Sequence, residues 1–587
     1  MCLWFGLWGS NWGCEAFSDC QESRTCAMAS DDVSGSSGAA GGGVGGQGGS
    51  VPVATPAAVE VAVTFGIKAF QFSWDEVSGA TFYRLLRQEG SSWQQEGADS
   101  SATTARVEVP LHLYDFGSAL YRVDACNESG CTPSNPVNVS DAAIDSVGYF
   151  KGSVTSSDES FGADVAFSKD GRFLAVGRPF GRCADAQTDA EGSVVVFERT
   201  ASGWVEESCA MLDESDYYSF GFGAALAIDA AGDTLLISAV GELVNATAFG
   251  GRAYLYERDG GSWTKVATLE APARAGGDSF GASVTLNDAG TVMAIGAPGR
   301  SPKGAAYVFV REGASVGRPV TITAPFGDTN DRFGESVSLS RDGKSLAIGA
   351  PSEDGGDKGL QGDEQDDTQL DSGAVYVFRS NGALWNQQAY VKASNTQAGD
   401  RFGAGVSLDA DGSTLAVGAS NEASDATGVD GDQVNDAAPG SGAVYVFARN
   451  GTAWTQQAYL KASAASPGAA FSNVSLSASG DVLAVGAPSE ASGGSGVVAA
   501  LDRSGSEDLE SGAAFVFARE TDSWVARSTI KGLAAASGDR FGHAVCLSAD
   551  GGTLAVGAPF EKSVAVGIGG DPTDDQPTYD LGAVYLY

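Results

Sequence analysis

Basic side chains are scarce in this sequence. Its 587 residues include 35 lysines and arginines against 74 aspartates and glutamates, so the formal net charge at pH 7 is −39. Such an excess of carboxylates repels phosphate backbones and anionic lipid headgroups, which argues against nucleic acid and membrane surfaces as partners. Long apolar runs are missing too: no segment approaches the roughly 18 consecutive apolar residues of a membrane-spanning helix. A transmembrane segment is therefore not expected.

Histidine is rarer still, because His112 and His543 are the only two copies. Cys546 lies three residues after His543 in a segment with the alternation of a strand, and this odd spacing sends the two side chains to opposite faces. The pair is therefore not expected to act as nucleophile and base. Phosphate loops, zinc signatures and nucleophile elbows are absent as well. We expect a protein that is not an enzyme, although the many carboxylates leave glycosidase chemistry open.

The first 57 residues lack the periodicity of helices and strands. The opening MCLWFGLWGSNW is apolar but lacks the basic n-region of a secretory signal peptide, so it fits such a peptide poorly. Cys14, Cys20 and Cys26 follow. Metal binding is one interpretation of these thiols, and the alternative is that they form disulfides or stay unpaired. A run rich in Gly and Ser comes next. Residues 1–57 are predicted to be a disordered, low-complexity tether.

Residues 58–141 show a different pattern, in which short runs such as VEVAVTF, AFQFSWDEV and ARVEVPLHLY alternate between apolar and polar residues. Alternation broken by Gly, Ser and Asn predicts a small β-sandwich. Cys126 and Cys131 flank the turn residues NESG, so they face each other across a hairpin at a separation suited to a disulfide. A disulfide there suits an oxidising compartment.

The remainder of the chain repeats one short motif. DRFGAGVSLDADGSTLAVGAS at 400–420 has close counterparts at 331 and 539. Each repeat contains runs like FGxxVxLS, LAVGAP and GAVYVF, and a fourth run such as WTQQAYLKA follows in the first six. We call the repeats copies one to seven, and they begin at Phe161, Phe222, Phe280, Phe333, Phe402, Phe471 and Phe541. Four short strands per repeat, with Asp-Gly turns between the first two, are typical of a propeller blade.

The way the ring closes can also be predicted. Copy seven contains three of the four runs, whereas VGYFKGS at 147–153 matches fourth-run endings such as AYLKAS. An N-terminal strand is therefore expected to complete the last blade and cover two open sheet edges. The predicted fold is all-β, with a seven-bladed propeller of four-stranded blades over residues 142–587, preceded by the sandwich.

The motif FGxxVxLSxDGxxLAVGAP with GAVYVF resembles the FG-GAP repeat, the unit of the seven-bladed propeller at the head of integrin alpha subunits and of secreted bacterial proteins. This resemblance covers residues 143–587. Trp74 within SWDEVSGATFYRLLR and Tyr121 within LYRVDACNESGC likewise resemble the core residues of fibronectin type III domains. Integrin-like repeats often carry a calcium loop of the form DxDxDGxxD in the first hairpin. SKDGRFL and SRDGKSL stand there in this chain, so that calcium function is not implied.

Acidic residues gather in the loops between the second and third runs of copies four to seven, which lie on one face of the predicted ring. We call these four segments the acidic loops: 352–372, 421–441, 489–511 and 560–581. Together they hold 23 acidic and three basic residues. Glu353, Glu422, Glu490 and Glu561 recur where each loop begins. Loops on a rigid scaffold are common binding sites, so this face is the predicted functional face.

Three of the acidic loops share a pattern, written GDEQDD, GDQVND and GDPTDD. Oxygen ligands at such spacing can assemble the coordination that Ca²⁺ prefers, and the alternative is a solvated acidic insertion. The loop of copy six lacks the pattern. The candidate metal ligands are Asp363, Asp366, Asp367, Asp432, Asn435, Asp436, Asp571, Asp574 and Asp575.

These observations favour a non-catalytic binding or adhesion protein that is secreted or displayed at the cell surface, with a tether at its N-terminus. It would present an acidic face to a protein or glycan partner, with Ca²⁺ as the candidate cofactor. One alternative is a propeller hydrolase or lyase acting on glycans or phosphoesters. The other is a structural component of a cell envelope or matrix.

Overall fold

A computed structural model describes residues 53–113, 116, 118–154, 158–183, 192–212, 221–245, 248–382, 384–498, 501, 510–574 and 579–587. Most of the predicted tether, including Cys14, Cys20 and Cys26, lies outside these residues. Within them, the fold consists of antiparallel β-sheets and one short helix, α1 (Ser140–Asp145). This helix was not expected, and it lies across the predicted domain boundary at 141.

The N-terminal domain consists of two sheets that share one core. The first contains β1 (Val61–Gly66), β2 (Ala69–Trp74) and β5 (Thr104–Glu108), and the second contains β4 (Ser92–Gln95), β3 (Phe82–Glu89), β6 (Leu120–Asn127), β7 (Gly130–Pro133) and β8 (Val137–Asn138). Phe70, Phe72 and Trp74 alternate along β2 and are buried. The Phe72 ring lies 5.0 Å from that of Tyr121, and the Trp74 ring lies 5.5 Å from that of Tyr83. The period-two pattern therefore identified the buried face of this domain.

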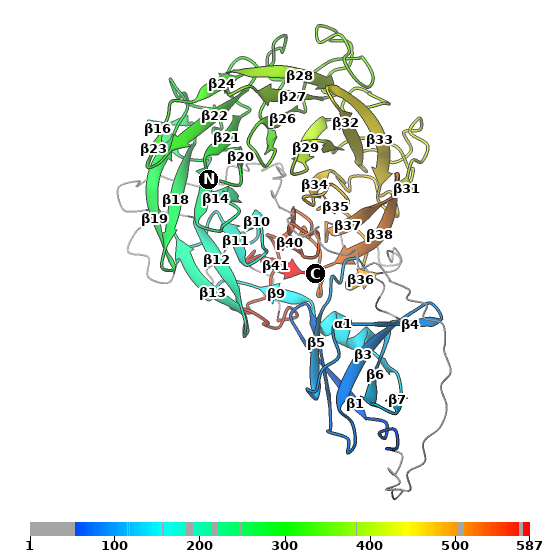
Figure 1. The fold of residues 1–587 in the computed structure, drawn as a ribbon. Coiled ribbons are helices and arrows are strands. Elements are labelled where there is room, and N and C mark those ends of the chain that lie inside the picture. The colour runs from blue at the N-terminus through cyan, green and yellow to red at the C-terminus, as the bar shows by residue number, and fades with distance from the viewer. Residues whose placement is uncertain are drawn as a thin grey trace, which may run out of the picture.

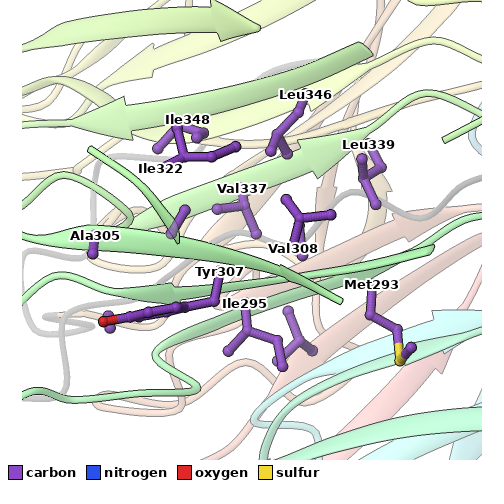
Figure 2. Packing of buried hydrophobic residues seen from close by; sticks show 14 of the residues in the cluster. Met293, Ile295, Ala305, Tyr307, Val308, Ile322, Val337, Leu339, Leu346 and Ile348 are labelled. Carbon is purple, nitrogen blue, oxygen red and sulfur yellow. The ribbon is translucent and has the colours of Figure 1, made fainter. Parts of the chain in front are cut away.

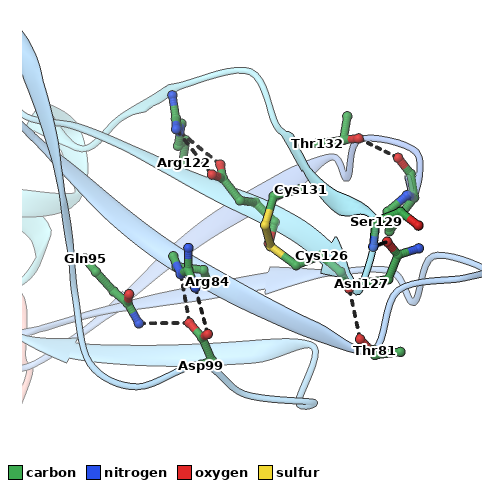
Figure 3. The surroundings of a disulfide bond; sticks show 12 residues. Thr81, Arg84, Gln95, Asp99, Arg122, Cys126, Asn127, Ser129, Cys131 and Thr132 are labelled. Carbon is green, nitrogen blue, oxygen red and sulfur yellow. Dashed lines mark hydrogen bonds and ion pairs between the residues drawn. A yellow bond between two sulfur atoms is a disulfide. The ribbon is translucent and has the colours of Figure 1, made fainter. Parts of the chain in front are cut away.

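A disulfide joins Cys126 to Cys131 in the hairpin of β6 and β7, as their spacing predicted (Figure 3). The two cysteines are directly opposite each other in the register, and the turn between them is closed by Asn127, whose side-chain oxygen accepts the N–H of Ser129 at 2.8 Å. Another Asn127 bond, to the carbonyl of Ala54, ties the hairpin to the start of the domain.

Each of the seven copies contributes a sheet, and these sheets are arranged around a ring (Figure 1). The sheet of copy one contains β10 (Val165–Phe167), β11 (Phe173–Arg178), β12 (Ser193–Thr200) and β13 (Gly203–Ala210), and that of copy two contains β14 (Phe222–Ile228), β15 (Thr234–Ala239), β18 (Arg252–Asp259) and β19 (Ser262–Leu269). The sheet of copy three contains β20 (Ser283–Leu286), β21 (Val292–Ala297) and β22 (Ala305–Glu312), and both β23 (Ser315–Val316) and β24 (Val320–Ile322) pair with β22. A separate hairpin is formed by β16 (Leu243–Asn245) and β17 (Ala248–Phe249).

Copies four to seven follow the same order. Copy four contains β25 (Ser336–Leu339), β26 (Ser345–Ala350), β27 (Ala374–Ser380) and β28 (Trp385–Val391), and copy five contains β29 (Phe402–Leu408), β30 (Thr414–Ala419), β32 (Ala443–Asn450), β33 (Ala453–Lys461) and the added β31 (Gly428–Val429). Copy six contains β34 (Asn473–Leu476), β35 (Val482–Ala487), β37 (Ala513–Glu520), β38 (Ser523–Lys531) and the added β36 (Gly496–Val498). The sheet of copy seven contains β39 (Ala544–Leu547), β40 (Leu554–Ala558), β41 (Ala583–Leu586) and β9 (Gly148–Phe150).

The last sheet is completed by β9, which comes from before copy one and pairs antiparallel with β41. Val584 is opposite Phe150, and Tyr585 is opposite Tyr149. This is the pairing that the resemblance of VGYFKGS to fourth-run endings predicted. It joins the N-terminal and C-terminal ends of the repeats within one sheet.

Successive sheets meet at the Phe of each motif, which bridges to the Gly before the third strand of the preceding copy. Phe222, Phe333 and Phe541 contact Gly192, Gly304 and Gly512 in this way, and Phe161 contacts Gly582 of copy seven, so the ring is closed. Gly582 has φ +77°, and a Cβ atom there would lie 2.2 Å from the carbonyl oxygen of Phe161. A larger residue would force the two sheets apart, which explains the Gly at this position of the repeat.

Apolar side chains of neighbouring sheets interdigitate between the blades. Figure 2 shows part of this core, where Val308 of copy three lies beside Val337 of copy four. Both side chains are at most 1% exposed. Such close packing fixes each sheet against its neighbours and makes the ring a rigid scaffold for its loops.

The N-terminal domain docks onto the first hairpin turn of copy seven. The Nε2 atom of His112 is 2.8 Å from the carbonyl oxygen of Gly551, and its Nδ1 atom is 3.1 Å from that of Tyr587. Lys68 bonds to Gly552 and Thr553 in the same turn. First-hairpin turns and acidic loops leave opposite ends of the strands, so the domain occupies the face opposite the acidic loops.

Candidate functional site

The described parts of the acidic loops fold back along the outer strands of their own sheets. Leu360 bridges to Val391 of β28, β31 pairs with β33, β36 pairs with β38, and Ile568 bridges to Phe150 of β9. Each loop therefore shields part of an outer strand, whose free edge would otherwise offer unpaired backbone groups. The sequence did not predict this path, because the pairing residues carry no long alternating pattern.

A buried ion pair lies at the base of each acidic loop. The recurring glutamates Glu353, Glu422, Glu490 and Glu561 are at most 3% exposed. Their carboxylates bond to lysine Nζ atoms on the outer strands or just after them: Glu353–Lys392 at 2.7 Å, Glu422–Lys461 at 2.7 Å, Glu490–Lys531 at 3.1 Å and Glu561–Lys151 at 2.6 Å. These glutamates therefore anchor the loops internally.

Hydroxyl groups complete the ion pairs. Around Glu422, the Tyr459 hydroxyl donates to the carboxylate at 2.8 Å, and Lys461 also donates to the Ser441 hydroxyl at 2.7 Å. Copy four repeats these contacts with Tyr390 and Ser372. Burial lowers the pKa of Lys461, and the charge of Glu422 opposes that fall. In copies four and five the lysine and the glutamate each have several partners, so these two pairs can persist without water.

The candidate metal ligands mostly close their own turns. Asp363, Asp432 and Asp571 accept the backbone N–H two residues further on, at 3.0, 2.9 and 2.9 Å. Asp366 and Asn435 accept the N–H of Thr368 and Ala437 at 3.2 and 3.3 Å. Such bonds are the ordinary role of Asp and Asn in polar turns. In the described structure, most residues of this pattern therefore stabilise the turns of their own loops.

The other candidate ligands are exposed or undescribed. Asp367, Asp436 and Asp574 are exposed, and Asp575 lies outside the described residues. Over the described part of the chain, no three Asp, Glu, His or Cys side chains are grouped so that they could hold a metal ion. The structure thus does not bring these residues together into a formed site, and Ca²⁺ binding stays a prediction. Most of LDRSGSEDLE in copy six is also outside the described residues.

A second set of buried carboxylates precedes the Phe of the motif and was not singled out from the sequence. It consists of Asp278, Asp331, Asp400 and Asp539, each at most 3% exposed. Each side chain accepts the backbone N–H three residues earlier, for example that of Gln397 at 2.8 Å from Asp400. The recurring Asp in GDSFG and DRFG was the available signal. These side chains fix the passage from one blade to the next.

Burial raises the pKa of Asp400 to about 7, and the charges of Glu422 and Asp436 add to this rise while Lys392 opposes it. The pKa of Asp331 is raised to about 6, also mainly by burial. Folded Asp400 therefore takes up a proton as the pH falls through about 7, whereas the unfolded chain does so only near pH 4.

We predict that the ring becomes more stable as the pH falls from 8 to 5, because protonation in this window favours the folded state. Asp400→Asn imitates the protonated carboxyl, so it should raise the unfolding temperature at pH 8 and flatten the pH dependence. The gain should amount to as much as about 4 kcal/mol. Asp411→Asn, in an exposed turn, is the matched control for thermal unfolding at both pH values. A destabilised Asp400→Asn protein at pH 8 would contradict the prediction.

A small cavity lies where the first strands of copies four to six begin and their second strands end, on the face of the acidic loops. Its volume is about 80 Å³. Arg332, Arg401, Glu335, Ser420, Ser472 and Asn473 contribute to its lining. Arg332 forms two-pronged bonds with Glu335 at 2.8 and 3.1 Å. We call this space the inner cavity.

A larger cavity, of about 270 Å³, lies in copy one beside a second disulfide, Cys183–Cys209. Arg178 is buried there, and its guanidinium bonds to Glu159 at 3.2 Å and to the Ser193 hydroxyl at 2.9 Å. The sequence did not predict this disulfide, because its cysteines are far apart in the chain and face no common turn. Both observed disulfides fit an oxidising compartment.

Comparison with known proteins supports the repeat. Three segments, 263–309, 318–378 and 385–447, match the family model described as FG-GAP repeat. No curated protein matches the chain.

The solved structures that resemble this chain do so distantly. The periplasmic gluconolactonase PpgL of Pseudomonas aeruginosa is 15% identical over 69% of this chain and 94% of its own, with a TM-score of 0.38. The RRP9 WD40 repeats are 9% identical over 75% of this chain and 96% of theirs, with a TM-score of 0.39. FN3tt is 22% identical over 14% of this chain and 89% of its own, with a TM-score of 0.12. The chain thus contains FG-GAP repeats within an all-β fold of antiparallel, mostly four-stranded sheets.

Proposed function

We propose that this chain is a non-catalytic binding protein of the extracellular space or cell surface, in which a seven-bladed propeller presents its acidic face to a protein or glycan partner. A fibronectin type III-like domain precedes the propeller. The observation that carries this proposal is the segregation of charge: the acidic loops hold 23 acidic and three basic residues on a rigid ring. The N-terminal domain docks on the opposite face, so it leaves the acidic face open.

The buried ion pairs support the same proposal. They hold the base of each acidic loop by an internal Glu–Lys contact, so the exposed carboxylates further along keep defined positions. A fixed field of one sign attracts partners of the opposite sign and raises the rate of association. The partner's contact surface should therefore be basic.

Two further observations bear on location. Within the described residues no helix is long and apolar enough to span a bilayer. Disulfides at Cys126–Cys131 and Cys183–Cys209 favour an oxidising environment such as the extracellular space.

The proposal is tested by binding to glycan and basic-peptide arrays, alongside a panel of hydrolase substrates. Asp363→Asn, Asp366→Asn and Asp367→Asn, combined in one variant, keep the turns of one acidic loop but remove three charges. The control variant combines Asp342→Asn, Asp411→Asn and Asp481→Asn, which remove three negative charges from turns on the opposite face. Binding should weaken in the first variant alone. Turnover of any substrate that a single carboxylate substitution abolishes would overturn the non-catalytic reading.

We further predict that Ca²⁺ stabilises the protein through the loops of copies four, five and seven. Clustered carboxylates repel one another, and a cation among them relieves this repulsion. Saturating Ca²⁺, at about 100 times the dissociation constant, should add about 2.7 kcal/mol per site. Thermal unfolding in millimolar Ca²⁺ and in chelator measures this, and the three-substitution loop variant should respond less. Identical unfolding curves in both media, with no heat on calorimetric titration, would leave the loops as solvated insertions.

A further inference from the structure

Two basic side chains of the N-terminal domain face one turn of the ring, at 551–553 of copy seven. Lys68 donates to a carbonyl and a hydroxyl of this turn, and His112 lies between another of its carbonyls and that of Tyr587. Among the described residues, neither side chain forms an ion pair across the interface. The buried lysines at the acidic loops, by contrast, each contact a glutamate. The docking interface therefore holds basic groups without counter-charges in contact.

Lys68 is the first of these groups. A charge that is removed from water without a counter-charge in contact costs free energy. Burial therefore lowers the pKa of Lys68 to about 7, while the charges of Asp550 and Glu108 moderate the fall and that of Arg199 adds to it. A neutral amine still has N–H groups for both of its oxygen partners. The docked interface thus favours the deprotonated form of Lys68.

His112 is the second group, and its side chain is 0% exposed. A neutral imidazole has one N–H, so it satisfies only one of the two carbonyls that face its nitrogens. A second proton would serve both carbonyls, but it would add a positive charge beside Lys68 in a space closed to water. Burial and the charge of Lys68 outweigh the two carbonyls and the charge of Asp550, and they lower the pKa of His112 to about 3. His112 therefore docks in its neutral form.

We infer that Lys68 and His112 form a pH switch, which holds the N-terminal domain on the ring at neutral to alkaline pH and releases it when the medium becomes acidic. In a released domain both side chains meet water, where lysine and histidine have pKa values of about 10.4 and 6.5. The docked state thus binds fewer protons than the released state, so a falling pH favours release. Lys68 acts between about pH 10 and 7, and His112 acts between about pH 6.5 and 3.

The architecture permits such a release. The N-terminal domain has its own two sheets and its own aromatic residues in the core, and it lies at one side of the ring (Figure 1). It can therefore leave as a folded unit. Its departure would uncover the turn of copy seven on the face opposite the acidic loops. This inference does not depend on the partner proposed for the acidic face.

The test is single-molecule FRET on the full chain at pH 8 and pH 5, with dyes attached at the exposed positions 128 and 481. The ratio of released to docked chains should rise about 100-fold between the two pH values. The double variant Lys68→Met with His112→Gln lacks both titrating groups, so it should stay docked at pH 5. Lys344→Met, on the equivalent turn of copy four, is the matched control and should behave like the native chain.

Lys68→Arg provides a second test, because arginine keeps its charge at both pH values. This variant should already show released chains at pH 8. Circular dichroism at pH 5 separates release from unfolding, since both domains should keep their β-structure. A native chain that stays docked at pH 5, or a Lys68→Arg chain that docks as firmly as the native chain at pH 8, would overturn the inference. Equal release in the native chain and the double variant at pH 5 would do the same.

Discussion

Removal of residues 1–155 should abolish cooperative folding of the ring, whereas removal of residues 1–141 should leave the ring folded. The longer deletion takes away β9, which pairs with β41 along Val584, Tyr585 and Leu586. Tyr149 and Phe150 are at most 2% exposed, and burial of two such side chains contributes about 2–3 kcal/mol each. The deletion also removes Lys151 and leaves Glu561 buried without its cation, at a further cost of about 3–5 kcal/mol. The sum approaches the whole stability of an ordinary domain, about 5–15 kcal/mol.

The shorter deletion is the control for this effect. It removes the contacts of Lys68 and His112 with the turn of copy seven, but it keeps β9 and Lys151 in place. The carbonyl groups that His112 approaches would bind water instead, so a modest loss of stability is expected. Circular dichroism and thermal unfolding of both truncations decide the matter. Similar unfolding temperatures for the two would refute the closure by β9.

The architecture could be predicted because its signals are local and repeated. Asp-Gly turns and period-two runs predict short strands within each copy, and seven similar copies predict a repetitive fold. The match of 147–153 to the fourth runs even indicated which distant strand pairs with β41. The alternating burial of Phe70, Phe72 and Trp74 shows the same rule at work in the N-terminal domain.

The candidate site was less predictable, because its contacts join residues that share no local pattern. Glu422 and Lys461 are each part of a recurrent motif, yet only the return of the acidic loop along β33 shows that they meet. His112 gave no sign that it would reach Gly551 in copy seven. The inner cavity depends on three copies at once. In the sequence, Ser420 and Ser472 depart from the residues that most copies have at these positions. Only the folded ring shows that both side chains line the same cavity.

Lys461→Met should destabilise the protein by about 3–5 kcal/mol, because it leaves the Glu422 carboxylate, 2% exposed, without its cation. The Tyr459 hydroxyl and the N–H of Ser424 would still donate to Glu422 but carry no full charge. The acidic loop 421–441 should then detach from β33 and become sensitive to protease. Urea unfolding and limited proteolysis measure the two effects. Lys344→Met, at an exposed turn where the lysine pairs with Asp342, should cost less than about 1 kcal/mol.

The decisive comparison is the double variant Glu422→Gln with Lys461→Met. Glutamine keeps an oxygen for the Tyr459 hydroxyl but no longer needs a counter-charge, so the double variant should be more stable than Lys461→Met alone. A coupling above about 1 kcal/mol between the two substitutions is expected for a buried pair in direct contact. Additive effects would mean that the ion pair does not anchor the loop. The positions of the exposed carboxylates on the acidic face would then need another cause, since the same Glu–Lys contact recurs in copies four, six and seven.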